Sequence, residues 1–167
     1  MRLSRIEQVD FMKREYPEKP VAGVGIIIYD KGKVLIIKRA FEPSKDRWSI
    51  PGGAIELGER VRDAARREVY EELGLEVEIK DVIEVLDNIV YEEKRIKYHF
   101  VLIDFWAEIQ DGSLKLSHEC LDAAWVSKDE LDSYDLTKGA RRAIEKVFEL
   151  LDSGHDHPFQ KTGREVR

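Results

Sequence analysis

Three glutamates in the stretch PGGAIELGERVRDAARREVYEELGLEV, residues 51–77, are spaced so that they can share one face of a helix: Glu68, Glu71 and Glu72. At ~100° per residue, they occupy about one third of the helix circumference. Like charges one turn apart destabilise a helix, so we expect a ligand that offsets the repulsion. Mg²⁺ or Mn²⁺ meets this requirement, because hard divalent cations bind carboxylate oxygens together with substrate phosphates.

The same helix must also be held against a core. An apolar stripe adjoins the acidic face and can pack on a sheet; it consists of Val61, Ala65, Val69 and Leu73. The acidic face therefore lies at the edge of the buried face, where a cleft can form, and the small side chain of Ala64 leaves room there. On its own, a glutamate- and arginine-rich face is typical of a solvated surface, with Arg67 and Glu71 as an ordinary ion pair.

Length and composition restrict the class of protein. The chain has 167 residues and a net charge of −6, which predicts one domain with its own core and argues against a nucleic-acid polymer as partner. Its single cysteine, Cys120, excludes an internal disulfide and any cysteine-rich zinc motif. Apolar runs reach strand length but not membrane length. We expect a cytoplasmic protein that is neither exported nor embedded in a membrane.

The rest of the chain predicts strands before and after this helix. Predicted strands cover residues 21–29, 33–39, 48–50, 75–86, 97–109 and 123–126, the first two joined by a hairpin at Asp30-Lys31-Gly32. A short helix after Ser127 and a buried helix face around Ile144 follow. The predicted fold class is α/β (α+β), a mixed sheet covered by helices on both sides. We expect an N-terminal helical extension over residues 1–20, one domain over 21–152 and a polar tail over 153–167.

The spacing around the acidic helix matches a known motif. The residues concerned are Gly53, Glu59, Arg67, Glu68, Val69, Glu71, Glu72, Gly74 and Leu75. Together they reproduce the signature G-x5-E-x7-R-E-U-x-E-E-x-G-U, in which U is an aliphatic residue. With the preceding hairpin, the segment RWSIPGG and Glu119 shortly before Trp125, the chain resembles the Nudix hydrolases, MutT-like enzymes that cleave nucleoside diphosphates linked to another group.

This resemblance implies an α/β/α sandwich and assigns roles to the motif. Glu68, Glu71 and Glu72 would bind the metal ions, with the carbonyl of Gly52 or Gly53 as a further ligand. Glu59 would belong to the same metal site, mainly through Arg67, which would orient a carboxylate by charge-assisted hydrogen bonds. Gly53 and Gly74 would allow tight turns at the two ends of the helix.

The reaction also needs a base and groups that bind substrate. Glu119 is the first candidate for the general base, since it stands in a polar loop before a strand, and Glu72 is the second. Arg39, Phe41 and Tyr91 are candidates for binding phosphate or stacking on a base. Trp48 and Tyr98 are further candidates to stack on a base, although both are expected in or near the core. His118, His155 and His157 are not expected to be ligands.

The resemblance points most directly to ADP-ribose pyrophosphatases, which give AMP and ribose 5-phosphate. The segments YPEKP and YHFVLIDFWAEI favour them. A proline often found beyond the motif in those enzymes is missing here, where Val90 and Tyr91 stand instead. A (d)NTP pyrophosphatase, a dinucleoside polyphosphate hydrolase and a non-catalytic nucleotide sensor remain alternatives. The expected partners are a small nucleotide and a second copy of the chain, in a homodimer formed by the N-terminal helix and the tail.

Overall fold

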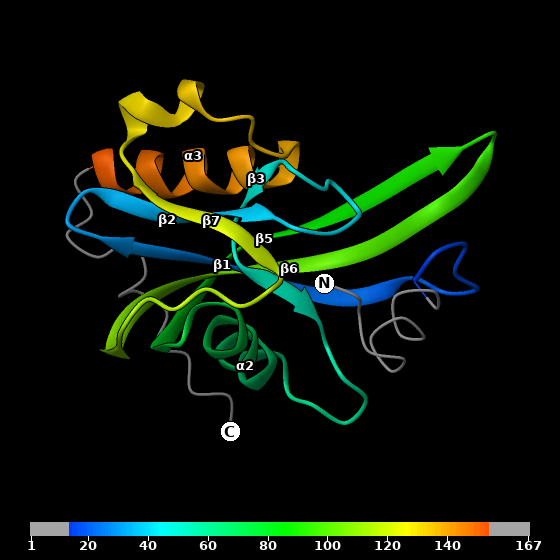
Figure 1. The fold of residues 1–167 in the computed structure, drawn as a ribbon, viewed down its shortest axis with the longest axis horizontal. Helices are drawn as coiled ribbons and strands as arrows, with labels where there is room; N and C mark the ends of the chain where they lie inside the picture. The colour runs from blue at the N-terminus through cyan, green and yellow to red at the C-terminus, as the bar shows by residue number, and fades with distance from the viewer. Residues whose placement is uncertain (1–13, 154–167) are drawn as a thin grey trace.

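The computed structural model describes residues 14–153. Its elements follow in the order β1 (Val21–Asp30), β2 (Lys33–Arg39), β3 (Trp48–Ser49), β4 (Gly52–Ala54), α2 (Val61–Leu73), β5 (Leu75–Glu92), β6 (Arg95–Gly112), β7 (Cys120–Val126), the 3₁₀ helix η1 (Lys128–Ser133) and α3 (Lys138–Asp152). Figure 1 shows α2 and α3 on opposite sides of the strands. The predicted sandwich of a mixed sheet between helices is therefore confirmed.

The sheet is mixed because β1 has partners of both directions. It runs parallel to β6, from Val21 opposite Phe100 to Ile28 opposite Ala107, and β5 extends the sheet antiparallel to β6. The β1–β2 hairpin pairs only next to its turn, and β4 then pairs with β1 antiparallel. This arrangement brings the glycines of β4 into the sheet, directly before α2.

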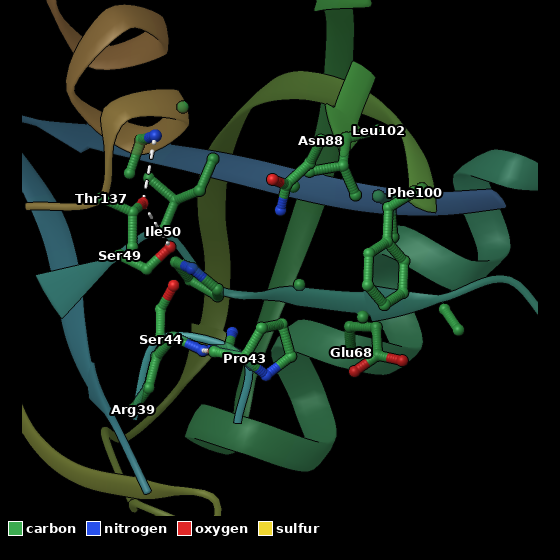
Figure 2. A pocket seen from close by; sticks show the side chains of 18 of the residues that line it. Arg39, Pro43, Ser44, Ser49, Ile50, Glu68, Asn88, Phe100, Leu102 and Thr137 are labelled. Atoms are coloured by element: carbon green, nitrogen blue, oxygen red, sulfur yellow. Dashed lines mark hydrogen bonds between the residues drawn. The ribbon is translucent and has the colours of Figure 1, made fainter. Parts of the chain in front are cut away.

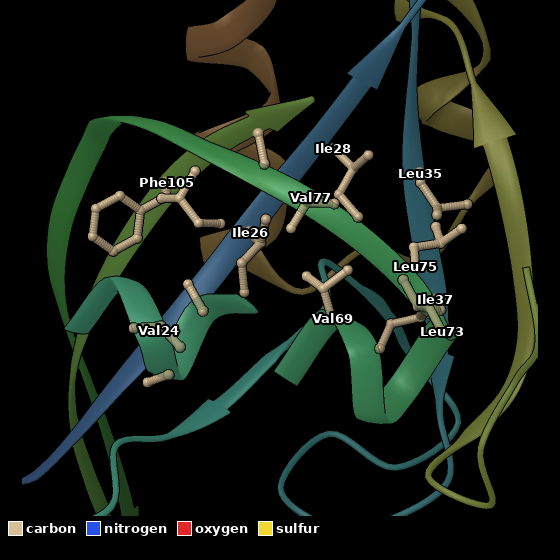
Figure 3. Close-up of a cluster of buried hydrophobic side chains, with 14 of the residues drawn as sticks. Val24, Ile26, Ile28, Leu35, Ile37, Val69, Leu73, Leu75, Val77 and Phe105 are labelled. Atoms are coloured by element: carbon tan, nitrogen blue, oxygen red, sulfur yellow. The ribbon is translucent and has the colours of Figure 1, made fainter. Parts of the chain in front are cut away.

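Two clusters of buried side chains hold the helices to the sheet. Alternate residues of β1 point to opposite faces: Ile26 belongs to the cluster under α2, and Ile27 to the cluster under α3. Figure 3 shows Val69 and Leu73 of α2 in the first cluster, together with side chains of β1 and β2. The predicted apolar stripe of α2 is thus the face that packs on the sheet.

Two hairpins differ in how well the sequence indicates them. Lys31 and Gly32 have φ values of 47° and 83°, as the predicted turn requires. The turn between β5 and β6 uses Glu93 and Lys94, with φ values of 48° and 67°, although neither is a typical residue for this conformation. Without a glycine or asparagine as a signal, the sequence prediction ended the first strand at residue 86 instead of 92 and began the second at residue 97 instead of 95.

Other predictions meet different outcomes. Ser127 and Glu130 form the predicted capping box, which opens the 3₁₀ helix η1. Residues 1–13 of the predicted N-terminal extension and all but the first residue of the polar tail lie outside the described residues, and the predicted dimer contact with them. Residues 14–20, which are described, contain no helix. Between residues 14 and 153, none of the helices combines the length and apolar character that a membrane span requires.

Candidate active site

A cavity of about 700 Å³ lies between α2 and the start of α3. Its α2 end is formed by Gly52, Gly53, Glu68 and Glu72, and its α3 end by Ser49, Leu86, Asp104 and Thr137. Figure 2 shows Glu68 on one side of this space and the hydrogen-bonded pair Ser49 and Thr137 on another. All three glutamates of the acidic face contribute to the lining, as does Glu119.

The buried apolar residues of α2 hold the helix against the sheet and so position its acidic side chains. It ends at Gly74, which has a left-handed φ of 67° and donates its N–H to the Tyr70 carbonyl. The apolar stripe fixes the rotation of the helix, so that Glu68 and Glu72 enter the cavity at 8% and 4% exposure. Glu71 stays largely exposed at the rim, with 58% of its side chain accessible.

Burial perturbs the two inner carboxyl groups. Desolvation raises the pKa of Glu68, and the Arg67 guanidinium only partly opposes it. The pKa of Glu72 is raised well above its ordinary value by burial and by the charge of Glu68. One oxygen of Glu72 accepts a hydrogen bond from the Gly52 N–H at 3.0 Å. A nearby positive charge would therefore stabilise the ionised forms of Glu68 and Glu72.

Gly53 lies directly against the carboxyl group of Glu68, which a larger side chain at this position would displace. A Cβ atom at Gly53 would stand 2.5 Å from the carboxyl carbon of Glu68, well inside van der Waals contact. Its backbone has no left-handed φ, whereas Gly52 does, at 152°. The expectation that Gly53 provides a tight turn was therefore wrong: its role is to let the carboxylate approach the main chain.

Arg67 connects the acidic residues. Its Nε and Nη2 donate to the two oxygens of Glu59 at 2.7 and 2.9 Å, and its Nη1 donates to Glu68 at 2.7 Å and Glu71 at 3.1 Å. This bidentate pairing holds the pKa of Glu59 at about 2. Because Glu59 does not line the cavity and both its oxygens face Arg67, it is placed to orient the arginine.

Three further residues surround the α2 end. Glu119 lines the cavity near Glu68 and Glu72, and its charge contributes to their raised pKa values. Arg39 ends β2 in the same cavity and donates its Nε–H to the Pro43 carbonyl. Phe41 also lines the cavity and meets the His118 ring edge to face at 5.9 Å. The structure thus brings together Arg39, Phe41 and Glu119, and adds His118, which the sequence interpretation set aside.

Tyr91 does not join this group. Its side chain is 64% exposed and does not line the cavity, so the expectation that it contacts substrate is not met. Side chains of β5 alternate, and Asn88 and Val90, which are less exposed than Tyr91, line the cavity. Tyr98 is buried and donates its hydroxyl to Glu15. Trp48 is partly buried against Tyr134.

The α3 end contains a buried acid that the sequence interpretation missed. Asp104 on β6 lines the cavity at 2% exposure, directly opposite Glu84 on β5. Burial and the charge of Glu84 raise the pKa of Asp104 to about 7. Asp104 stands within the apolar run FVLIDFWA, and an acidic residue at an inward position of such a strand is the signal that could have identified it.

The raised pKa of Asp104 predicts a pH-dependent stability. Between about pH 4 and pH 7 the folded protein binds a proton that the unfolded chain has lost, so this group stabilises the fold less as pH rises. We expect Asp104→Asn, which mimics the protonated acid, to stabilise the protein relative to wild type by at least ~1 kcal/mol more at pH 8 than at pH 5. Urea unfolding of both proteins at the two pH values measures this, and a difference that does not grow with pH would contradict the assignment.

The acidic residues can be tested for their fit to a divalent cation. Among residues 14–153, no group of three or more acidic, histidine or cysteine side chains is already gathered as a metal site, since Arg67 holds Glu71 toward the rim. Glu68 and Glu72 nonetheless fit a hard cation, because they are buried oxygen donors whose mutual repulsion it would relieve. Glu71 and the Gly52 carbonyl are the nearest groups that can complete the set.

An acidic cavity of this kind, beside a helix that presents three glutamates, is suited to metal-assisted hydrolysis of phosphoric acid anhydrides, the reaction of pyrophosphatases. The model of the NUDIX domain matches residues 19–147. The chain therefore belongs to the Nudix hydrolase family, as its sequence motif predicts. Members of this family generally use divalent metal ions.

Individual relatives agree with this family. An ADP-ribose pyrophosphatase of Methanocaldococcus jannaschii is 30% identical over 126 residues, which cover 75% of this chain and 73% of the relative. The nucleoside triphosphatase NudI of Escherichia coli K12 is 26% identical over 71% of this chain and 89% of its own length. Among solved structures, the MutT Nudix hydrolase of Burkholderia pseudomallei has a TM-score of 0.71 at 31% identity, covering 78% of this chain and 99% of that chain.

Proposed function

We propose that this protein is a Mg²⁺-dependent hydrolase of ADP-ribose that releases AMP and ribose 5-phosphate. The observation that carries the proposal is the cavity in which Glu68, Glu71, Glu72 and Glu119 meet Arg39. The similarity to an archaeal ADP-ribose pyrophosphatase supports the substrate. A volume of about 700 Å³ is suited to a ligand of this size.

Bound divalent ions would supply neutralisation of phosphate charge and activation of water, with Glu68, Glu71, Glu72 and the Gly52 carbonyl as the groups that hold them. The remaining steps fall to the chain's own residues. Arg67 fixes Glu68, and the Gly52 N–H fixes Glu72. These fixed geometries lower the cost of reorganisation during the reaction.

Substrate binding and proton transfer involve the residues around the metal site. Arg39 is placed to pair with a phosphate oxygen, and Phe41 offers an apolar surface beside it. Glu119 is the proposed general base that takes the proton of the attacking water, because it is exposed to solvent in the cavity and stands beside the inner carboxylates. Glu72 is the alternative base.

A substrate panel tests the function. We expect the purified protein with Mg²⁺ to hydrolyse ADP-ribose to AMP and ribose 5-phosphate with a kcat/KM of at least ~10⁴ M⁻¹s⁻¹, and to lose this activity in EDTA. Ion-exchange chromatography identifies the products. Dinucleoside polyphosphates and ordinary or oxidised dNTPs are the comparison substrates. Higher kcat/KM on any of these would reject ADP-ribose as the substrate.

A second function follows from the similarity to NudI. As a nucleoside triphosphatase of this kind, the protein would cleave a (d)NTP and release pyrophosphate and a nucleoside monophosphate. The released product separates this possibility from ADP-ribose hydrolysis, which gives no pyrophosphate. Failure to turn over any compound of the panel, with and without Mg²⁺ or Mn²⁺, would instead favour a nucleotide sensor.

A further inference from the structure

Asp104 is a buried acid without a stabilising partner among the described residues. It is 2% exposed, and within residues 14–153 its pKa reflects only burial and the charge of Glu84, with no hydrogen bond that lowers it. Glu84, its cross-strand neighbour, is 8% exposed and forms an ion pair with Arg142 of α3, while one of its carboxylate oxygens is buried without a partner. Two acids opposite each other destabilise a sheet, and an unpaired buried carboxylate adds a desolvation cost.

The main chain of β1 makes room for this side chain. A Cβ atom on Gly25 would lie 2.3 Å from Oδ1 of Asp104 and 2.8 Å from the end of Ile50. Any larger residue at position 25 would push the carboxylate away. The bare backbone therefore keeps Asp104 at the cavity wall, while Glu84 behind it does not line the cavity.

The surroundings of Asp104 suit a flat heterocycle. Leu86 and Leu102 form a cross-strand pair on the same cavity face. A Cβ atom on Gly139 of α3 would lie 3.6 Å from Cδ1 of Leu86. Figure 2 shows Leu102 and Asn88 next to each other on this wall. Apolar walls with one or two fixed polar groups are typical of sites that bind a ring and read one of its edges.

We propose that Asp104 accepts a hydrogen bond from the exocyclic amino group of the substrate's nucleobase, so that the α3 end selects adenine or cytosine over their deaminated counterparts. This inference rests on the proposed function, which places the phosphates at the α2 end. Deamination replaces the amino donor by a carbonyl oxygen. That oxygen and the Asp104 carboxylate are both acceptors, so they cannot form a hydrogen bond with each other. A site that leaves a buried polar group unpaired strongly rejects such an analogue.

The test compares matched nucleotides. At about pH 8.5, where Asp104 is ionised, we expect wild-type protein to bind AMP more tightly than IMP, and CMP more tightly than UMP, by at least ~10-fold in isothermal titration calorimetry. In Asp104→Asn the amide can donate as well as accept, so both ratios should fall to about one or reverse. Turnover of ADP-ribose and of its hypoxanthine analogue provides a second measurement with the same pyrophosphate bond.

Glu84→Gln is the matched control. It removes one charge of the same buried pair but does not touch the cavity, so the amino preference should stay as in wild type. Equal binding of the paired nucleotides by wild type, or an unchanged preference in Asp104→Asn, would overturn the inference. If Glu84→Gln loses the preference for the amino nucleotides, the inference is also overturned. The charge of the Asp104–Glu84 pair, rather than contact with the base, would then set the selectivity. Binding is measured without turnover, so failure of the proposed hydrolysis is distinguished from failure of base recognition.

Discussion

Replacing Glu72 by glutamine is expected to lower kcat by at least ~10²-fold while the protein stays folded. Glutamine keeps an oxygen that can accept the Gly52 N–H, so the local geometry is retained. The substitution removes the negative charge, which Glu72 needs whether it acts as a metal ligand or as the general base. Steady-state kinetics with ADP-ribose and saturating Mg²⁺ measure the effect.

Stability supplies a check on this result. Because burial raises the pKa of Glu72, an uncharged side chain should leave the melting temperature of the metal-free protein unchanged or higher. Glu76→Gln, an exposed change outside the cavity, is the control and should keep wild-type activity. Full Mg²⁺-dependent turnover in Glu72→Gln would remove Glu72 from the reaction.

Glu119→Gln then separates the two candidate bases. If Glu119 is the base, its variant loses kcat with an unchanged Mg²⁺ concentration for half-maximal activity. If Glu72 is the base, Glu119→Gln should keep most of the wild-type kcat.

Changing Arg67 to lysine is expected to lower kcat/KM by ~10- to 100-fold and to raise the Mg²⁺ concentration needed for half-maximal activity. Lysine keeps the charge but cannot hold Glu59 with two parallel hydrogen bonds while also reaching Glu68. The inner carboxylate then loses its fixed orientation. A Mg²⁺ titration of activity, with a thermal melt beside it, measures both effects.

Arg66→Lys is the matched control for this change. Arg66 stands next to Arg67 on α2 but is exposed and forms an ion pair with Asp63. An exposed pair of this kind contributes little, so activity and Mg²⁺ requirement should remain those of wild type. If Arg67→Lys behaves the same way, Arg67 does not orient the metal site.

The sequence predicted the acidic helix well because local spacing determines it. The apolar stripe of α2 and the acidic residues beside it are separated by intervals that only a helix places on adjoining faces. The structure has the helix from Val61 to Leu73, with Glu68 and Glu72 at the edge of the core. The family motif, confirmed by the NUDIX domain match, rests on the same local spacing.

The α3 end of the cavity could not be predicted in this way. It forms where β5, β6 and the start of α3 meet, and Asp104 faces Glu84 only through the register of two long strands. The sequence does not predict the register of β5 against β6, because the turn between them contains Glu93 and Lys94 instead of glycine or asparagine. The error at Tyr91 has the same origin, since a strand's inward face depends on where pairing begins.

The parallel pairing of β1 with β6 has a consequence for synthesis of the protein on the ribosome. β1 leaves the exit tunnel before its neighbours, and the strand segment that covers one of its edges, residues 100–107, is translated only after α2 and β5. Until then the nascent chain carries an apolar strand with an open edge, which other chains can pair with. Because α3 emerges after β6, the catalytic compartment closes only once α3 has been translated, and a truncated chain that stops before β6 would be prone to aggregation rather than partly active.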